Sequence, residues 1–98
     1  MPRPQKLSDA EIEERLAGLE GWSREGDEIV TEFQLDDFVA AVGLIAQIGV
    51  LAERMNHHPT LTNTYNRVGV ALNTHDAGGI TEYDFSLAAE INERAGRA

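Results

Sequence analysis

Side chains that can exchange protons near neutral pH gather in the second half of the chain. The three histidines, His57, His58 and His75, lie within a stretch of 19 residues, and two carboxylates, Glu53 and Asp84, flank that stretch. An imidazole has a reference pKa of about 6.5, so it can give up or take a proton at physiological pH. The grouping therefore predicts general acid–base catalysis, provided that the fold brings these side chains to one place.

The spacing of these residues predicts how they are oriented. Glu53 precedes His57 by four positions, which places the two side chains on one face of a helix. We therefore expect Glu53 to orient His57 and to stabilise its imidazolium form. His58 comes directly before Pro59 and is biased away from helical dihedrals, so we expect it to point across the mouth of the same cleft. Asp84 opens a later helix, where the positive end of the helix dipole favours an ionised carboxylate.

Each of these residues also has an ordinary structural interpretation. A glutamate such as Glu53 is usually solvated on a helix surface, and a histidine pair suits the C-terminal end of a helix. His75 fits a polar turn, and Asp84 fits the third position of a capping box. Because the chain has no other histidine, it is their clustering that favours a functional site.

Metal binding and nucleophilic hydrolysis are the rival chemistries. Three histidines and two carboxylates could ligate zinc or iron, but adjacent histidines seldom share one metal, and we predict no metal site. The chain has no cysteine, and its three serines lie in no Gly-x-Ser-x-Gly context. The pair Gly78-Gly79 has no Lys or Arg beside it and is too little for a phosphate loop. Neither hydrolysis by a nucleophile nor phosphate binding is favoured.

Composition limits the partners and the compartment. The 98 residues suffice for one domain, spanning 1–98, with one hydrophobic core. Eight basic and 17 acidic residues give a net charge of −9, which disfavours nucleic acids and anionic membranes. The first residues lack an apolar signal core, and no window approaches the run of about 18 apolar residues that a membrane span needs. We therefore expect a soluble, cytoplasmic protein.

The order of predicted elements indicates the fold class. Ser8-Asp9-Ala10-Glu11 has capping-box spacing and predicts a helix from about residue 9. The later pattern predicts, in chain order, a hairpin over 22–35, a long helix capped by Asp36 and ending near 56, one or two strands over 60–74, and a helix from about 82. This order favours an α+β fold with helices on one face of a small antiparallel sheet. The long helix is apolar over more of its surface than one sheet can cover, so we expect an oligomer.

Three segments together resemble the pterin-4a-carbinolamine dehydratase family. They are Glu53-Arg54-Met55-Asn56-His57-His58-Pro59, then Asn63-x-Tyr65-Asn66-x-Val68, then Thr74-His75-Asp76-Ala77-Gly78-Gly79-Ile80-Thr81 with Asp84. The acidic first helix, Gly21-Trp22 and Asp37-Phe38 are also similar to the family, so the resemblance spans nearly the whole chain. It implies helices packed on a four-stranded antiparallel sheet, in the order α-β-β-α-β-β-α, usually in dimers or tetramers.

The resemblance also implies a reaction that needs no metal or other cofactor. The substrate would be 4a-hydroxytetrahydropterin, formed when an aromatic amino acid hydroxylase uses its tetrahydropterin. The products would be quinonoid dihydropterin and water, a step of tetrahydrobiopterin recycling. Hydroxide is a poor leaving group, so the 4a-oxygen needs a proton from a general acid while a base removes the N5 proton.

The same resemblance implies roles for particular residues. We expect His57, oriented by Glu53, and His75 to act as acid and base, in either order. His58 would position the pterin, and Asp84 would hold His75 or the substrate.

Two further residues are expected at the substrate site, Thr74 and Leu61. Leu61 stands where many family members carry an aromatic residue two positions after the proline, so the preference among pterins could differ.

The alternative from another class is a non-catalytic interaction module. Some members of the family also serve as dimerisation cofactors of a transcription factor, and the long apolar helix would suit such a role. An interaction role alone, however, would not require the set of histidines.

Overall fold

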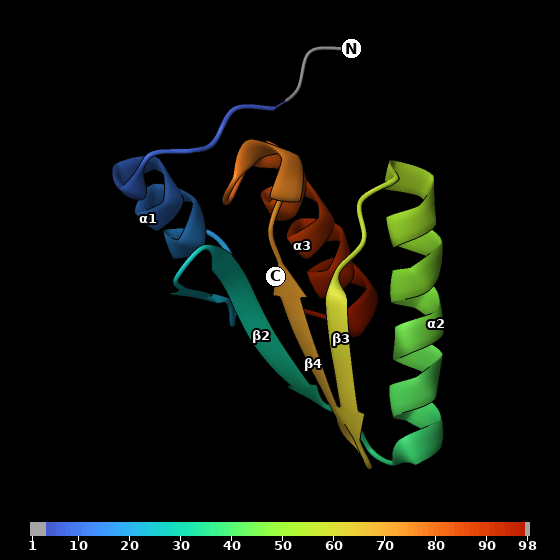
Figure 1. The fold of residues 1–98 in the computed structure, drawn as a ribbon. Helices are drawn as coiled ribbons and strands as arrows, with labels where there is room; N and C mark the ends of the chain where they lie inside the picture. The colour runs from blue at the N-terminus through green and yellow to red at the C-terminus, as the bar shows by residue number, and fades with distance from the viewer. Residues whose placement is uncertain (1–3, 98) are drawn as a thin grey trace.

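Three α-helices cover one face of a four-stranded antiparallel sheet in the computed structural model, which describes residues 4–97 (Figure 1). The helices are α1 (Asp9–Ala17), α2 (Phe38–Met55) and α3 (Glu82–Ala95), with a short 3₁₀ helix, η1 (His75–Ala77), before α3. The strands are β1 (Ser23–Glu25), β2 (Glu28–Gln34), β3 (Thr60–Thr64) and β4 (Arg67–Leu72). The predicted α+β fold and its order α-β-β-α-β-β-α are confirmed.

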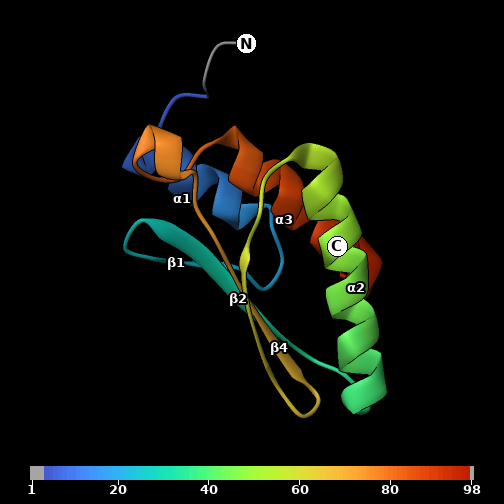
Figure 2. The same cartoon turned by 45° about the vertical axis from the view of Figure 1, so that its right-hand side comes forward.

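Two hairpins make the sheet, whose strand order is β1-β2-β4-β3. The central strands β2 and β4 alternate between a buried face and an open face, as a half-buried antiparallel sheet requires. Their inward residues pair directly across the two strands: Ile29 with Leu72, Thr31 with Val70, and Phe33 with Val68. Figure 2 shows the helices on the inward side and the other face of the sheet uncovered.

Local capping residues fix where the helices begin. Ser8 caps α1 and Thr81 caps α3, each in a complete capping box, as the sequence predicts. The N-cap of α2 is Asp37 rather than the predicted Asp36, and its side chain accepts from the Ala40 amide at 2.8 Å. The boundaries therefore follow short-range hydrogen bonding that the sequence already encodes.

Helix α2 buries one side and leaves apolar residues exposed on the other. Its core-facing residues are Ala41, Leu44, Ile48, Leu51 and Ala52, whereas Phe38, Val39, Val42 and Val50 are exposed. With 18 residues, α2 is long and apolar enough to cross a membrane, a property that core helices of soluble proteins share. Of the six large apolar side chains that are exposed within residues 4–97, four lie on the exposed face of α2.

The C-terminal end of the described chain is tied to the sheet by Arg97. Its guanidinium donates to Thr31 Oγ1 and to the Glu32 carbonyl, both at 2.7 Å, and lies 4.0 Å from the centre of the Phe33 ring. Partial burial lowers the pKa of this guanidinium from its usual value. Gly21, whose φ of +83° favours glycine, leaves the space that the guanidinium occupies.

Candidate active site

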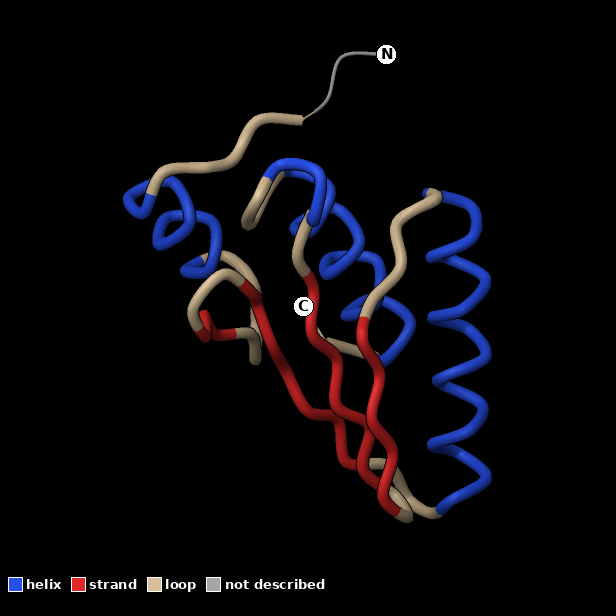
Figure 3. The backbone as a smooth tube through the Cα atoms, in the orientation of Figure 1, coloured by secondary structure: helices blue, strands red, loops and turns tan. Residues whose placement is uncertain are grey.

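The end of α2, the 3₁₀ helix η1 and the start of α3 lie at the same end of the molecule (Figure 3), and the three histidines lie just after α2 and in η1. His57 and His58 directly follow the C-cap of α2, and His75 opens η1. Together with Asn56, Asn73, Thr74 and Asp76, they line an open cavity of about 230 Å³. The fold therefore brings together three imidazoles from two separate segments, which is the arrangement that acid–base chemistry needs.

The last turn of α2 decides where His57 points. Asn56 adopts a left-handed conformation, with φ 50° and ψ 44°, and ends the helix. The next side chain, that of His57, is thereby directed to α3, where its Nε2 lies 2.6 Å from Asp84 Oδ1. The predicted pairing of Glu53 with His57 is wrong, because His57 lies beyond the helix and the four-residue spacing no longer applies to it.

Glu53 instead pairs with His58. The Oε1 of Glu53 lies 2.6 Å from the Nε2 of His58, and both side chains are well exposed to solvent. Such a pair orients its imidazole only weakly, since water competes for both partners. The two adjacent histidines thus have different carboxylate partners and different freedom to move.

Asp84 lies behind His57 in a fully buried position. Its Oδ2 accepts from the Thr81 amide at 2.9 Å and from Thr74 Oγ1 at 3.0 Å. The expectation that Asp84 holds His75 is wrong, since its other oxygen contacts His57. Asp84 does not line the cavity, but it contacts two residues that do, His57 and Thr74.

Of the two remaining predicted residues, Thr74 and Leu61, only one lines the cavity. Thr74 lines it, although its hydroxyl is committed to Asp84. Leu61 lies on β3, half-buried against the core, and is not among the residues that line the cavity. The ring of Tyr83, which sequence analysis missed, stands edge-on to His57 with the ring centres 5.9 Å apart.

Sequence analysis also missed four residues near the histidines. Asn56, Asn73 and Asp76 line the cavity, and Thr81 hydrogen-bonds to Thr74. A signal for Thr81 was present, because the capping box identifies it as the partner of Asp84. No pattern pointed to the two asparagines.

The carboxylates and imidazoles are arranged in separate pairs. Within residues 4–97 no group of three or more His, Asp or Glu side chains is placed to hold a metal ion. One carboxylate serves each of two imidazoles, which suits proton exchange at individual rings.

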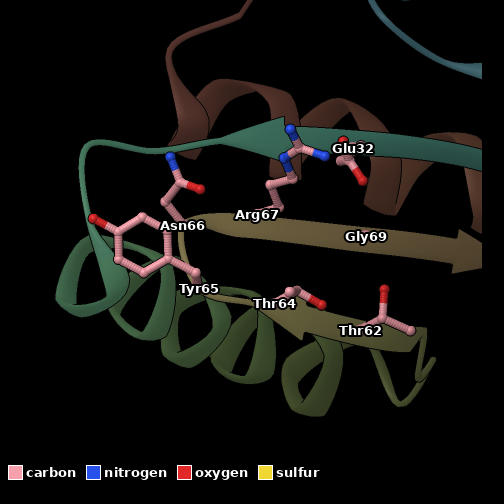
Figure 4. A pocket seen from close by; sticks show the side chains of 7 residues that line it. All are labelled: Glu32, Thr62, Thr64, Tyr65, Asn66, Arg67 and Gly69. Atoms are coloured by element: carbon pink, nitrogen blue, oxygen red, sulfur yellow. The ribbon is translucent and has the colours of Figure 1, made fainter.

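A larger cavity, of about 410 Å³, lies on the open face of the sheet near the β3–β4 turn (Figure 4). It is lined by Glu32, Thr62, Thr64, Tyr65, Asn66, Arg67 and Gly69. No histidine is among these residues, whereas the smaller cavity is lined by three, so the imidazoles that suit acid–base chemistry lie at the smaller cavity.

Comparison with known proteins gives the family. Residues 5–94 match the model of the family described as pterin 4 alpha carbinolamine dehydratase. The chain belongs to this family. The pterin dehydratase family is thereby assigned over nearly the whole sequence, including every residue of the histidine-lined cavity.

Relatives in this family match the chain along most of its length. A protein of Chloroflexus aurantiacus is 52% identical over 96 residues, which cover 98% of this chain and all of the relative. A protein of Roseiflexus sp. (strain RS-1) is 49% identical over 88 residues, covering 90% of this chain and 95% of the relative. Both carry the name "Putative pterin-4-alpha-carbinolamine dehydratase".

Solved structures share the fold. A transcriptional coactivator/pterin dehydratase from Brucella melitensis superposes with a TM-score of 0.91 at 39% identity, covering 94% of this chain and all of the other. A pterin dehydratase-like protein identified as a RuBisCO assembly factor in the alpha-carboxysome has a TM-score of 0.69 at 18% identity, covering 80% of this chain and 93% of that one. The second likeness concerns the fold alone.

Proposed function

We propose that the chain is a single-domain dehydratase that converts 4a-hydroxytetrahydropterin to quinonoid dihydropterin and water. The observation that carries the proposal is the meeting of His57, His58 and His75 at one cavity in a member of the pterin dehydratase family. Imidazoles suit the reaction because both a proton donor and a proton acceptor are needed near neutral pH.

The proposed chemistry is proton transfer at two atoms of the pterin. One imidazole protonates the 4a-oxygen so that it leaves as water, and another removes the N5 proton as the C4a=N5 double bond forms. His57 and His75 take these two roles, and His58, held by Glu53, positions the ring. Asp84 and Thr74 act on the site by supporting His57.

This activity would serve the recycling of tetrahydrobiopterin in the cytoplasm. The substrate would be supplied by an aromatic amino acid hydroxylase, to which the dehydratase would be coupled functionally. Neither a nucleic acid nor a membrane is proposed as a partner, in keeping with the net charge of −9.

A second copy of the chain is the partner proposed for the exposed face of α2. Phe38, Val39, Val42 and Val50 present apolar side chains that nothing covers in the single chain. Burying such a face against another copy removes apolar area from water, and this is the usual driving force of association. We propose a homodimer or homotetramer.

A second candidate function, a non-catalytic interaction module, has one observation in its favour. The same exposed face of α2 would dock a partner, and the Brucella relative is described as a transcriptional coactivator as well as a pterin dehydratase. This role makes no use of the histidines, so activity separates the two candidates.

The deciding experiment is the rate of dehydration of 4a-hydroxytetrahydropterin with purified protein, measured against the spontaneous rate. We expect acceleration, and His57→Ala and His75→Ala should each lower turnover by roughly 10²-fold or more. Tyr65→Ala, an exposed change at the far hairpin turn, is the control. A rate equal to the spontaneous one, from folded protein, would leave the interaction module as the function.

A further inference from the structure

A buried chain of hydrogen bonds leads from α3 to His57. It runs from Thr81 to Thr74 at 2.7 Å between the hydroxyl oxygens, from Thr74 to Asp84 at 3.0 Å, and from Asp84 to His57 at 2.6 Å. Thr74, Thr81 and Asp84 are all buried. Buried polar groups with fixed partners hold one arrangement of protons, because water cannot replace either partner.

The direction of each hydrogen bond follows from counting donors. Asp84 Oδ2 accepts from the Thr81 amide and from the Thr74 hydroxyl, whose single proton is thereby used. In the contact between the two hydroxyls, Thr81 must therefore be the donor. The Thr81 oxygen in turn accepts from the Tyr83 amide at 3.2 Å. Every proton in the chain points towards Asp84.

An aspartate in these surroundings acts as an acceptor at both oxygens. Two donors meet Oδ2, and the residue lies in the first turn of α3, where the helix dipole favours a negative charge. The remaining oxygen, Oδ1, faces Nε2 of His57. Since an ionised carboxylate only accepts, Nε2 must carry the proton.

The other ring nitrogen of His57 is left for chemistry. Within residues 4–97, Nδ1 has no hydrogen-bond partner. Within these residues, no side-chain nitrogen or oxygen that is buried lacks a hydrogen-bond partner. Since Nδ1 has no partner, it is not buried and must reach the solvent. His57 is otherwise nearly enclosed and lines the cavity, so Nδ1 is the ring nitrogen that remains available to a ligand there.

We propose that Thr81 and Thr74, acting through Asp84, hold His57 as its Nε2–H tautomer and make Nδ1 the nitrogen that exchanges protons with the bound pterin. The inference rests on the proposed dehydratase function and deepens it. During dehydration the N5–H and C4a–O bonds break and the C4a=N5 bond forms, so the proton that N5 loses is balanced by the one that the leaving hydroxyl gains. His57 handles one of these protons at Nδ1, and Asp84 stabilises the imidazolium whenever Nδ1 is protonated.

Thr81 and Thr74 are positioning residues in this scheme. Neither hydroxyl moves a proton to the substrate, since the Thr81 hydroxyl donates to Thr74 and the Thr74 hydroxyl donates to Asp84. Without the Thr74 hydroxyl, Oδ2 keeps only the amide of Thr81, and the carboxylate is free to turn. His57 would then lose its single tautomer, and the fraction of molecules with a bare Nδ1 would fall.

The test reads the tautomer directly, in protein labelled with ¹⁵N-histidine and free of substrate. Two-bond ¹⁵N–¹H correlation spectra, recorded where the imidazoles are neutral, should show His57 protonated at Nε2 and bare at Nδ1. A proton on Nδ1, or a mixture of the two tautomers, would overturn the inference even if the protein is an active dehydratase. The expected tautomer in a protein that does not accelerate dehydration would instead overturn the proposed function and remove the role of Nδ1 with it.

Matched variants separate positioning from general stability. Thr74→Val should give mixed His57 tautomers and lower kcat by about 10-fold with little change in KM. Thr74→Ser, which restores the hydroxyl, should recover the single tautomer and kcat. Thr81→Val should give less mixing of the tautomers and a smaller fall in kcat than Thr74→Val does. The control is Thr64→Val, the same change on the exposed strand β3. Folded Thr74→Val protein that keeps a single tautomer and full kcat would contradict the proposal.

Discussion

The carboxylate of Glu53 and the imidazole of His58 form a pair on the solvent side of the histidine-lined cavity. Oε1 and Nε2 are 2.6 Å apart, and the two side chains are 79% and 55% exposed. His57, by contrast, is held by the fully buried Asp84. The site thus combines one imidazole in a fixed position with one that can adjust to a ligand.

Replacing Glu53 by Gln should affect ligand positioning more than folding. An exposed ion pair is worth about 0.2–1 kcal/mol, so the free energy of unfolding should change by no more than that, and KM should rise by at most about 5-fold. Steady-state kinetics and urea unfolding measure the two quantities. Glu13→Gln, on the exposed side of α1, is the control. A large fall in kcat with unchanged KM would show that Glu53 takes part in proton transfer.

Sequence patterns predicted the features of this fold that depend on near neighbours. The capping boxes at Ser8 and Thr81 each involve residues three positions apart, and the alternation in β2 reflects one buried face. These rules need no knowledge of the rest of the chain. The starts of α1 and α3 and the order of the strands along the chain were therefore predictable.

The partners of the histidines were not predictable in the same way. His57 and Asp84 are 27 residues apart, and their contact depends on how α2 packs beside α3. The left-handed Asn56 redirects the chain just before His57, so that Glu53 pairs with the next histidine, His58. Asparagine tolerates this conformation, but its presence alone does not distinguish a left-handed cap from one more helical residue.

A methyl group at Gly21 should destabilise the protein by displacing Arg97. The positive φ of +83° itself costs a non-glycine residue about 1–2 kcal/mol, and an added Cβ would overlap the guanidinium. Loss of the hydrogen bonds that Arg97 makes should add about 1–2 kcal/mol to the cost of Gly21→Ala. Urea unfolding measures the total.

Gly26 provides the matched control for that change. It also has a positive φ, of +61°, but nothing lies within 4 Å of an added Cβ. Gly26→Ala should therefore show only the backbone cost. In an Arg97→Ala background, Gly21→Ala should cost no more than Gly26→Ala does. Equal costs for the two glycines in the wild-type background would contradict this account.

The ion pair between α1 and α3 should make part of the stability depend on pH. Arg15 Nη1 donates to Glu82 Oε2 at 2.7 Å, and the hydrogen bonds from Arg15 lower the pKa of the Glu82 carboxyl below its ordinary value of 4.5. A carboxyl whose pKa is lower in the folded state stabilises the fold above about pH 4.5, and this contribution disappears as the pH falls through the folded pKa.

Glu82→Gln should accordingly lower the free energy of unfolding at neutral pH by at most about 1 kcal/mol, since the pair is exposed to solvent. The difference from the wild type should shrink as the pH falls towards about 3. Urea unfolding at both pH values measures it. Glu90→Gln, on the same helix and without an ion-pair partner in residues 4–97, should show no such dependence. A deficit that persists at low pH would mean that the lost contact is not electrostatic.

The exposed face of α2 should control the number of subunits. Val39 is 78% exposed in the single chain, so Val39→Glu removes no core contact and should leave the fold intact. A glutamate buried between two copies would instead lack a partner, and its desolvation opposes association. Light scattering after size exclusion should show a dimer or tetramer for the wild type and a smaller species for Val39→Glu. Ala10→Glu adds the same charge on α1 and should leave the mass unchanged. A wild-type protein that is monomeric would exclude a contact between copies. A Val39→Glu variant of unchanged mass would place that contact on another surface.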